Sequence, residues 1–340
     1  MNSTKFSISI AAAAILTACG GGGGDDSKQS ENSNNPGNGN ATVATAAVLN
    51  GTNYQAVAQE ALNSSTYLLK SASMATGAQT NSAQAVLEVG EEQARELLKR
   101  FGRSQVVAVG VIHTETEACA SGGSITYTDD DRNGNGKVDA GDSATLTANK
   151  CNMGNGIIMN GQLNLVANSV SGNMDSPPFS LAANITYNNF EVVVGSSKAS
   201  GNGTATISFS VQNASNISTK MSTQSLTLAA SNANVNTQQT LRGYTASSAI
   251  NGSIASTSAD GILVTSNLNN QSIQITTPTP FKIDNSRSRY PHQGVMIITG
   301  ANTTSVRITS VDSTTVKLEL DADGDGKYEV NQTKPWSQML

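Results

Sequence analysis

Apolar and small polar residues alternate with a period of two along most of the chain from residue 106 onward. In TATISFSVQ (204–212), Ile207, Phe209 and Val211 alternate with hydroxyl-bearing residues, and SLTLAA, SIQITT, SVRITSV and TVKLELD show the same pattern. A period of two places successive side chains on opposite faces of a β-strand. The pattern predicts antiparallel strands that form a sheet with one buried and one wet face.

Turn signals separate these segments. The dipeptides Asn160-Gly161, Asn251-Gly252 and Asp260-Gly261 predict hairpin turns between neighbouring strands. No repeat of fixed period is visible, which argues against a solenoid. The expected fold is mainly β: a large antiparallel β-sheet domain over residues 105–340, either a sandwich or a curved half-barrel, preceded by one or two N-terminal helices.

Residues 46–104 carry the helical signals. Apolar residues recur at helical spacing from Tyr54 to Ala72, Thr52 and Gln55 form a capping-box pattern, and Gly77 is a stop signal. A second helix is predicted within 82–102, where glutamates come early and basic residues late, as the helix dipole favours. We expect this helical segment to pack on the β domain.

Composition narrows the choice of partners. Charged residues make up 13% of the chain, and the net charge is −5. No basic run or basic-aromatic patch is present, so nucleic acid is excluded as an expected partner. The many Ser, Thr, Asn and Gln residues are typical of secreted β proteins.

The N-terminus has the parts of an export leader. Lys5 is followed by a short apolar run over 6–15, too short to span a bilayer, and then by LTAC, which ends at Cys19. LTAC resembles the lipobox of bacterial lipoproteins. The resemblance implies a signal peptide over 1–18, diacylglycerol attachment and palmitate acylation at Cys19, and, with Gly20 next, transport to the outer membrane. The alternative is an ordinary secretory leader with a chance cysteine.

Residues 19–45 are expected to form a tether. The stretch from Gly20 to Asn40 is rich in Gly, Asn and Ser and contains no large apolar residue. Such a segment cannot bury a core. The protein is therefore expected to be anchored to the membrane through its lipid, on the periplasmic or the surface face.

Two cysteines remain in an oxidising compartment. Cys119 and Cys151 are predicted to form a disulfide, because that compartment favours oxidation of such a pair. The alternative, a redox-active pair, would need the C-x-x-C spacing that these cysteines lack. The bond would close a loop that contains an acidic stretch, DDDRNGNGKVDAGD (129–142).

That acidic stretch fits a calcium-loop register, which requires oxygen ligands at positions 1, 3, 5, 7 and 9, Gly at 6 and a carboxylate at 12. The register resembles an EF-hand or dockerin loop, although the flanks read as strands and not as helices. The predicted ligands are Asp131, Asn133, Asn135, Lys137 through its carbonyl, Asp139 and Asp142.

A second copy follows in DADGDGKYEVNQ (321–332). Position 12 is Gln332, so we expect a weaker site or a more direct use of Glu329. The predicted ligands are Asp321, Asp323, Asp325, Lys327 and Glu329. Calcium is expected to be structural, because a sensor needs a helix pair that opens. The alternative is that both stretches are Asp/Asn/Gly turns without an ion.

No catalytic motif is present. The sequence lacks G-x-S-x-G and H-E-x-x-H, and its two histidines, His113 and His292, are read as surface residues. We therefore predict a protein that is not an enzyme; a hydrolase with a dispersed triad is the third hypothesis.

The stretch 288–330 resembles the C-terminal part of proteobacterial lipoproteins of unknown activity. We predict a lipid-anchored cell-envelope protein with a binding or structural role, whose ligand is a glycan or an envelope protein. The alternative is a carrier or chaperone of lipids at the outer membrane, which would need an apolar concave face.

Overall fold

The computed structural model describes residues 44–72, 89–90, 93–94, 96–97, 112–154, 156–173, 176–232 and 236–340. The predicted signal peptide, Cys19, the tether and most of the predicted second helix lie outside these residues. Val89, Gly90, Gln93, Ala94, Glu96 and Leu97 are described and are helical.

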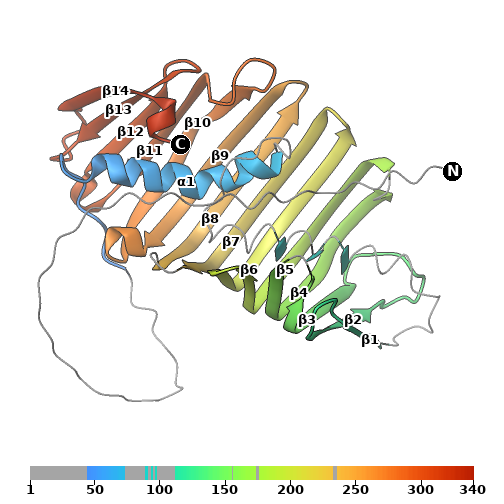
Figure 1. Cartoon of the computed structure of the whole chain (residues 1–340). Helices are drawn as coiled ribbons and strands as arrows, with labels where there is room; N and C mark the ends of the chain where they lie inside the picture. The colour runs from blue at the N-terminus through green and yellow to red at the C-terminus, as the bar shows by residue number, and fades with distance from the viewer. Residues whose placement is uncertain are drawn as a thin grey trace, which may run out of the picture. The chain divides into compact units, whose positions relative to one another are not determined.

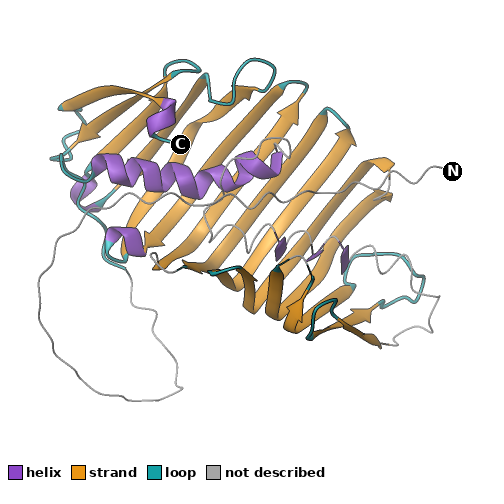
Figure 2. Cartoon of the chain, viewed as in Figure 1, coloured by secondary structure: helices purple, strands orange, loops and turns teal. Residues whose placement is uncertain are grey.

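The described chain forms one antiparallel sheet of fourteen strands in which every strand pairs with its neighbours in sequence (Figures 1 and 2). The sheet is open, so the expected mainly β fold is confirmed as a single sheet and not as two packed sheets. The strands are β1 (Ile112–Ala118), β2 (Ser124–Asp130), β3 (Ser143–Asn152), β4 (Ile157–Asn173), β5 (Ser176–Val194), β6 (Ser197–Asn213), β7 (Asn216–Ser231), β8 (Asn236–Asn251), β9 (Ile254–Thr265), β10 (Gln271–Asp284), β11 (Gln293–Thr299), β12 (Ser305–Ser310), β13 (Thr315–Asp321) and β14 (Val330–Pro335).

One helix, α1 (Tyr54–Ala72), lies against one face of the sheet, over β7–β9 and β12–β13 (Figure 1). Val57, Ala58 and Ala61 on its inner side are fully buried, as the helical spacing predicted. Three short 3-10 turns complete the described elements: η1 (Ser266–Leu268), η2 (Ala301–Thr303) and η3 (Trp336–Gln338).

The start of α1 differs from the prediction. Asn50 and Asn53 form the cap: the Asn53 carboxamide accepts from the Asn50 N–H at 2.9 Å, and the Asn50 side chain accepts from the Thr52 N–H at 2.9 Å. Gln55, the expected capping partner, instead contacts Tyr54 and Gln332. Asn binds free N–H groups at helix starts as well as Thr does, and here it takes that role.

The two faces of the sheet differ in chemistry. The helix face carries the alternate apolar residues, such as Leu163, Ile185, Leu226 and Ile308, each at most 3% exposed. The opposite face, called here the hydroxyl face, carries Thr, Ser and Asn. Its side chains bond across strands, for example Asn164 to Thr145 at 2.8 Å. These cross-strand pairs stabilise register without an apolar partner.

Two of the three predicted turns lie inside long strands, each opposite a β-bulge of a neighbouring strand. Gly161 of β4 faces the bulged residues Asn189 and Phe190 of β5, and Gly261 of β9 faces Gly243 and Tyr244 of β8. Only Asn251-Gly252 connects two strands, β8 and β9. All three glycines of these dipeptides have positive φ, so the dipeptide alone does not distinguish a turn from a position opposite a bulge.

Candidate metal centre and polar hollow

Both acidic stretches are hairpin loops. The first joins β2 to β3 and the second joins β13 to β14, so the predicted flanking strands are present in both cases. The two hairpins lie near opposite edges of the sheet.

The first residue of each loop anchors the same backbone cradle. The Asp131 carboxylate accepts from the N–H groups of Gly134 at 2.8 Å and Gly136 at 2.7 Å. The equivalent Asp321 accepts from the N–H groups of Gly324 at 2.7 Å and Gly326 at 2.9 Å.

These contacts give the glycines at position 4 a role that the sequence analysis missed. Gly134 and Gly324 both have positive φ, of 67° and 78°. The shared N-G-N-G and D-G-D-G patterns are the signal that could have found them.

The residues at positions 3 and 5 also hold the same geometry in both loops. The side chain of Asn135 accepts from the Lys137 N–H at 2.7 Å, and that of Asp325 accepts from the Lys327 N–H at 2.7 Å. Each loop therefore has its side-chain oxygens fixed by its own backbone, which is the arrangement that calcium loops use to gather ligands.

The loops differ at the closing carboxylate. In the first loop Asp142 at position 12 accepts from the Arg132 N–H at 3.0 Å. In the second loop Glu329, at position 9, accepts from the equivalent Ala322 N–H at 2.9 Å. Glu329 thus makes the backbone contact that Asp142 makes in the first loop, and its expected use as an ion ligand stays a prediction.

Gln332 is occupied elsewhere. Its Oε1 accepts from the Tyr54 hydroxyl at 2.8 Å and from the Gln55 amide at 2.8 Å, so position 12 of the second loop binds α1 instead of the loop.

Four carboxylates converge in the second loop. Asp321, Asp323, Asp325 and Glu329 place oxygen atoms within 4.8 Å of one another, and no other such group occurs among the residues that the structure describes. Lys327 donates to Asp325 at 2.9 Å and holds the pKa of that carboxyl below its usual range. Four carboxylates whose oxygen atoms lie this close together form a donor set that can hold a hard metal ion.

The first loop uses its donors differently. The amides of Asn133 and Asn135 donate to the Asp139 carboxylate at 2.8 and 2.7 Å, and these bonds lower the pKa of Asp139. All six predicted ligand residues lie in this loop, and metal binding there stays a prediction.

Cys119 and Cys151 form the predicted disulfide, with their Cα atoms 5.4 Å apart. It links the end of β1 to the end of β3. The hairpin of β2 and β3 is therefore fixed at one end by the disulfide, and its other end is the acidic loop.

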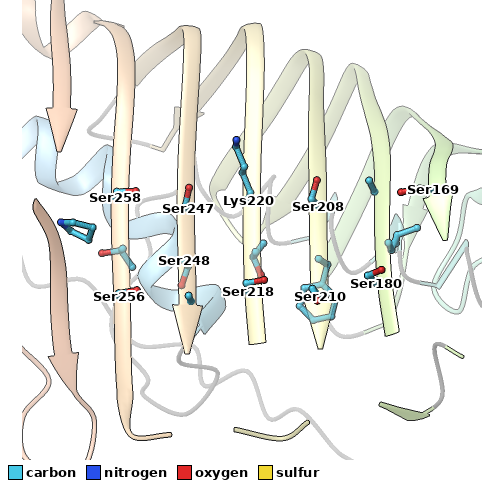
Figure 3. A pocket seen from close by; sticks show the side chains of 17 residues that line it. Ser169, Ser180, Ser208, Ser210, Ser218, Lys220, Ser247, Ser248, Ser256 and Ser258 are labelled. Atoms are coloured by element: carbon cyan, nitrogen blue, oxygen red, sulfur yellow. The ribbon is translucent and has the colours of Figure 1, made fainter. Parts of the chain in front are cut away.

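A hollow of about 610 Å³ opens on the hydroxyl face across β4–β9 (Figure 3). Two rows of residues line it, all small except Lys220, and each row is formed by residues that pair directly between strands. The rows are Ser169, Ala182, Ser208, Lys220, Ser247 and Ser258, and Ser180, Ser210, Ser218, Ala249 and Ser256. The residues between the two rows that also line the hollow are Leu181, Phe209, Thr219, Ser248 and Thr257. Serines at alternate positions in several strands were the sequence signal for this hollow, and they were not singled out.

The histidines do not meet. His113 lies on β1 and His292 just before β11, both exposed, and the nine strands β2–β10 lie between β1 and β11.

Helices in the described part of the chain are too short or too polar to cross a bilayer. By its fold and its candidate sites, the protein belongs to the class of open antiparallel β-sheet proteins. One helix lies on the sheet, and two of the hairpin loops are rich in acidic residues. Comparison with family models, with curated proteins and with solved structures found no match to this chain.

Proposed function

We propose that the protein is a cell-envelope binding protein, lipid-anchored at Cys19 in the outer membrane, that contacts polysaccharide through the hollow of the hydroxyl face. The hollow itself carries this proposal. Its volume of about 610 Å³ falls in the range of ligand sites, and serine hydroxyls both donate and accept hydrogen bonds.

The shape of the hollow favours an elongated ligand. The row from Ser169 to Ser258 crosses five spacings between neighbouring strands, which gives a length of about 24 Å at the usual separation of β-strands. Lys220 stands in the middle of this row and adds one cation, which can bind an acidic substituent of a sugar chain.

The test is binding of the full chain to a panel of envelope polysaccharides, with two matched variants. Ser208→Phe fills the hollow from β6. Ser225→Phe places the same side chain on the hydroxyl face of β7, outside the hollow. We expect the first variant to lose retention on polysaccharide and the second to keep it. Equal retention by both variants, or none by the native chain, contradicts the proposal.

We further propose that the second acidic loop binds calcium and that the ion stabilises the last hairpin. Asp321 is 3% exposed and is fixed by two backbone N–H groups, so its carboxylate is already in position. Extracellular calcium modules bind with dissociation constants of about 10⁻⁴ to 10⁻³ M. At a calcium concentration ten to a hundred times higher, binding stabilises the fold by about 1.4–2.7 kcal/mol.

Thermal unfolding with calcium or with a chelator tests this second proposal. Asp325→Asn keeps the oxygen that accepts from the Lys327 N–H but removes a charge, and Asp139→Asn makes the same change in the first loop. We expect Asp325→Asn to lose a measurable part of the calcium-dependent rise in melting temperature. The part of the rise that this variant keeps measures calcium binding by the first loop. A melting temperature that chelation leaves unchanged would refute a structural role for the ion.

A further inference from the structure

Glu60 is a charged residue on the buried side of α1. It follows Val57 by one helical turn and is 7% exposed. Its Oε1 accepts from the Gln239 amide at 2.7 Å and from the Thr265 hydroxyl at 2.8 Å, and its Oε2 accepts from the Asn267 amide at 3.0 Å.

All three of these partners are neutral. No Lys, Arg or His in the described part of the chain forms an ion pair with Glu60. A buried carboxylate without a cation is unfavourable, because removal from water is offset only in part by neutral hydrogen bonds. A carboxylate accepts about four hydrogen bonds, so one position on Glu60 stays open.

Glu60 also lies at the wall of a second hollow. Glu60 lines a space of about 410 Å³ between α1, η1 and the segment around η3. The buried carboxylate is thus reached from solvent through a site built by three separate elements.

Two further polar residues of this hollow, Gln59 and Asn267, add acceptors. Gln59 uses its amide nitrogen to bind the Gln338 carbonyl at 2.8 Å, and Asn267 uses its own on Glu60, which leaves the carboxamide oxygens of both for a ligand. A carboxylate with amide oxygens around it is complementary to a ligand group that has a positive charge and only hydrogen-bond donors.

A primary ammonium group has these properties, since it offers three donors and one charge. A metal ion fits less well, because one carboxylate side chain lines this hollow, whereas the second acidic loop gathers four. We propose that the hollow beside Glu60 binds a small organic cation whose primary ammonium group contacts the free lone pair of the Glu60 carboxylate.

Calorimetry on the full chain tests this proposal with 1,4-diaminobutane as the probe and 1,4-butanediol as its uncharged counterpart. We expect the diamine to bind and the diol not to bind. Glu60→Gln keeps the shape of the side chain, and the Asn267 amide can rotate to accept from the new amide group. The variant should weaken diamine binding by about tenfold or more, the value of one charge-assisted hydrogen bond.

A second pair of variants keeps the test valid if Glu60→Gln does not fold. Ala56→Phe fills the hollow from the exposed side of α1 without touching the Glu60 contacts, and Val48→Phe puts the same ring on an exposed position outside the hollow. Loss of binding in Ala56→Phe alone supports the proposal. Absence of diamine binding to the native chain, or binding that survives both Glu60→Gln and Ala56→Phe, overturns it.

Discussion

Replacement of Gly161 by Ala tests the bulge of β5, whose residues Asn189 and Phe190 lie opposite Gly161 of β4. Gly161 has a φ of +91°, and a Cβ atom built on it would lie 2.1 Å from the carbonyl oxygen of Asn189 on β5. The contact is with backbone, which cannot move aside as a flexible side chain can. The substitution therefore combines backbone strain with a steric clash inside a paired region.

The magnitude follows from these two terms. A non-glycine residue in such a region of φ costs about 1–3 kcal/mol. Overpacking against fixed neighbours adds about 1–3 kcal/mol, so the total for Gly161→Ala is about 2–6 kcal/mol. Gly252→Ala is the matched control, because Gly252 also has positive φ, at +62°, but no atom lies within 4 Å of its Cβ position. Its expected cost is about 1–2 kcal/mol, from strain alone.

Denaturant unfolding of both variants measures the difference in the free energy of unfolding. If Asn160-Gly161 were a hairpin turn, as the sequence predicts, the two glycines would tolerate Ala equally. A loss for Gly161→Ala no larger than that for Gly252→Ala would therefore refute the bulge and the continuous strand β4.

Three further predictions concern stability. Reduction of the disulfide, which spans 32 residues, should lower the free energy of unfolding by about 3–4 kcal/mol in the chain-entropy model, and denaturant curves with and without reductant measure this. Asp312 accepts from the hydroxyls and N–H groups of Thr314 and Thr315, and these bonds lower its pKa from 3.8 to about 2. Because the pKa of Asp312 is lower in the folded state, its contribution to the free energy of unfolding is complete above about pH 4 and is lost as the pH falls toward 2. Asp312→Asn should make acid unfolding between these values less steep. Arg307 forms an ion pair with the buried Glu319 at 2.6 Å, so Arg307→Met should destabilise the protein by about 1–3 kcal/mol in thermal melts. This loss is smaller than for a fully buried ion pair, because the Arg307 side chain is 37% exposed and Lys317 also contacts Glu319. An Arg307→Met variant as stable as the native chain would contradict a role for this pair.

Much of the candidate metal centre was visible in the sequence, because its geometry is local. Asp321, Asp323 and Asp325 are spaced so that backbone turns alone bring them together. The role of Glu329 as the closing carboxylate was only one of two outcomes, since it depends on where Gln332 goes. Gln332 binds Tyr54 and Gln55, which precede it by 278 and 277 residues.

The hollow on the hydroxyl face and the buried Glu60 were not predicted, and both are long-range features. Small residues line the hollow only because the register aligns serines of several strands into rows. Glu60 meets Gln239, Thr265 and Asn267 only after α1 has docked on the sheet.

By itself the sequence determined what depends on local periodicity and spacing: the strands, the first helix, the disulfide pair and the two acidic loops. The tertiary structure alone decided that the strands form one open sheet, that Gly161 and Gly261 lie inside strands opposite bulges, and which face carries the hollow. The physical reason is that alternation specifies two faces for each strand, whereas pairing register and helix docking fix which residues of different strands meet.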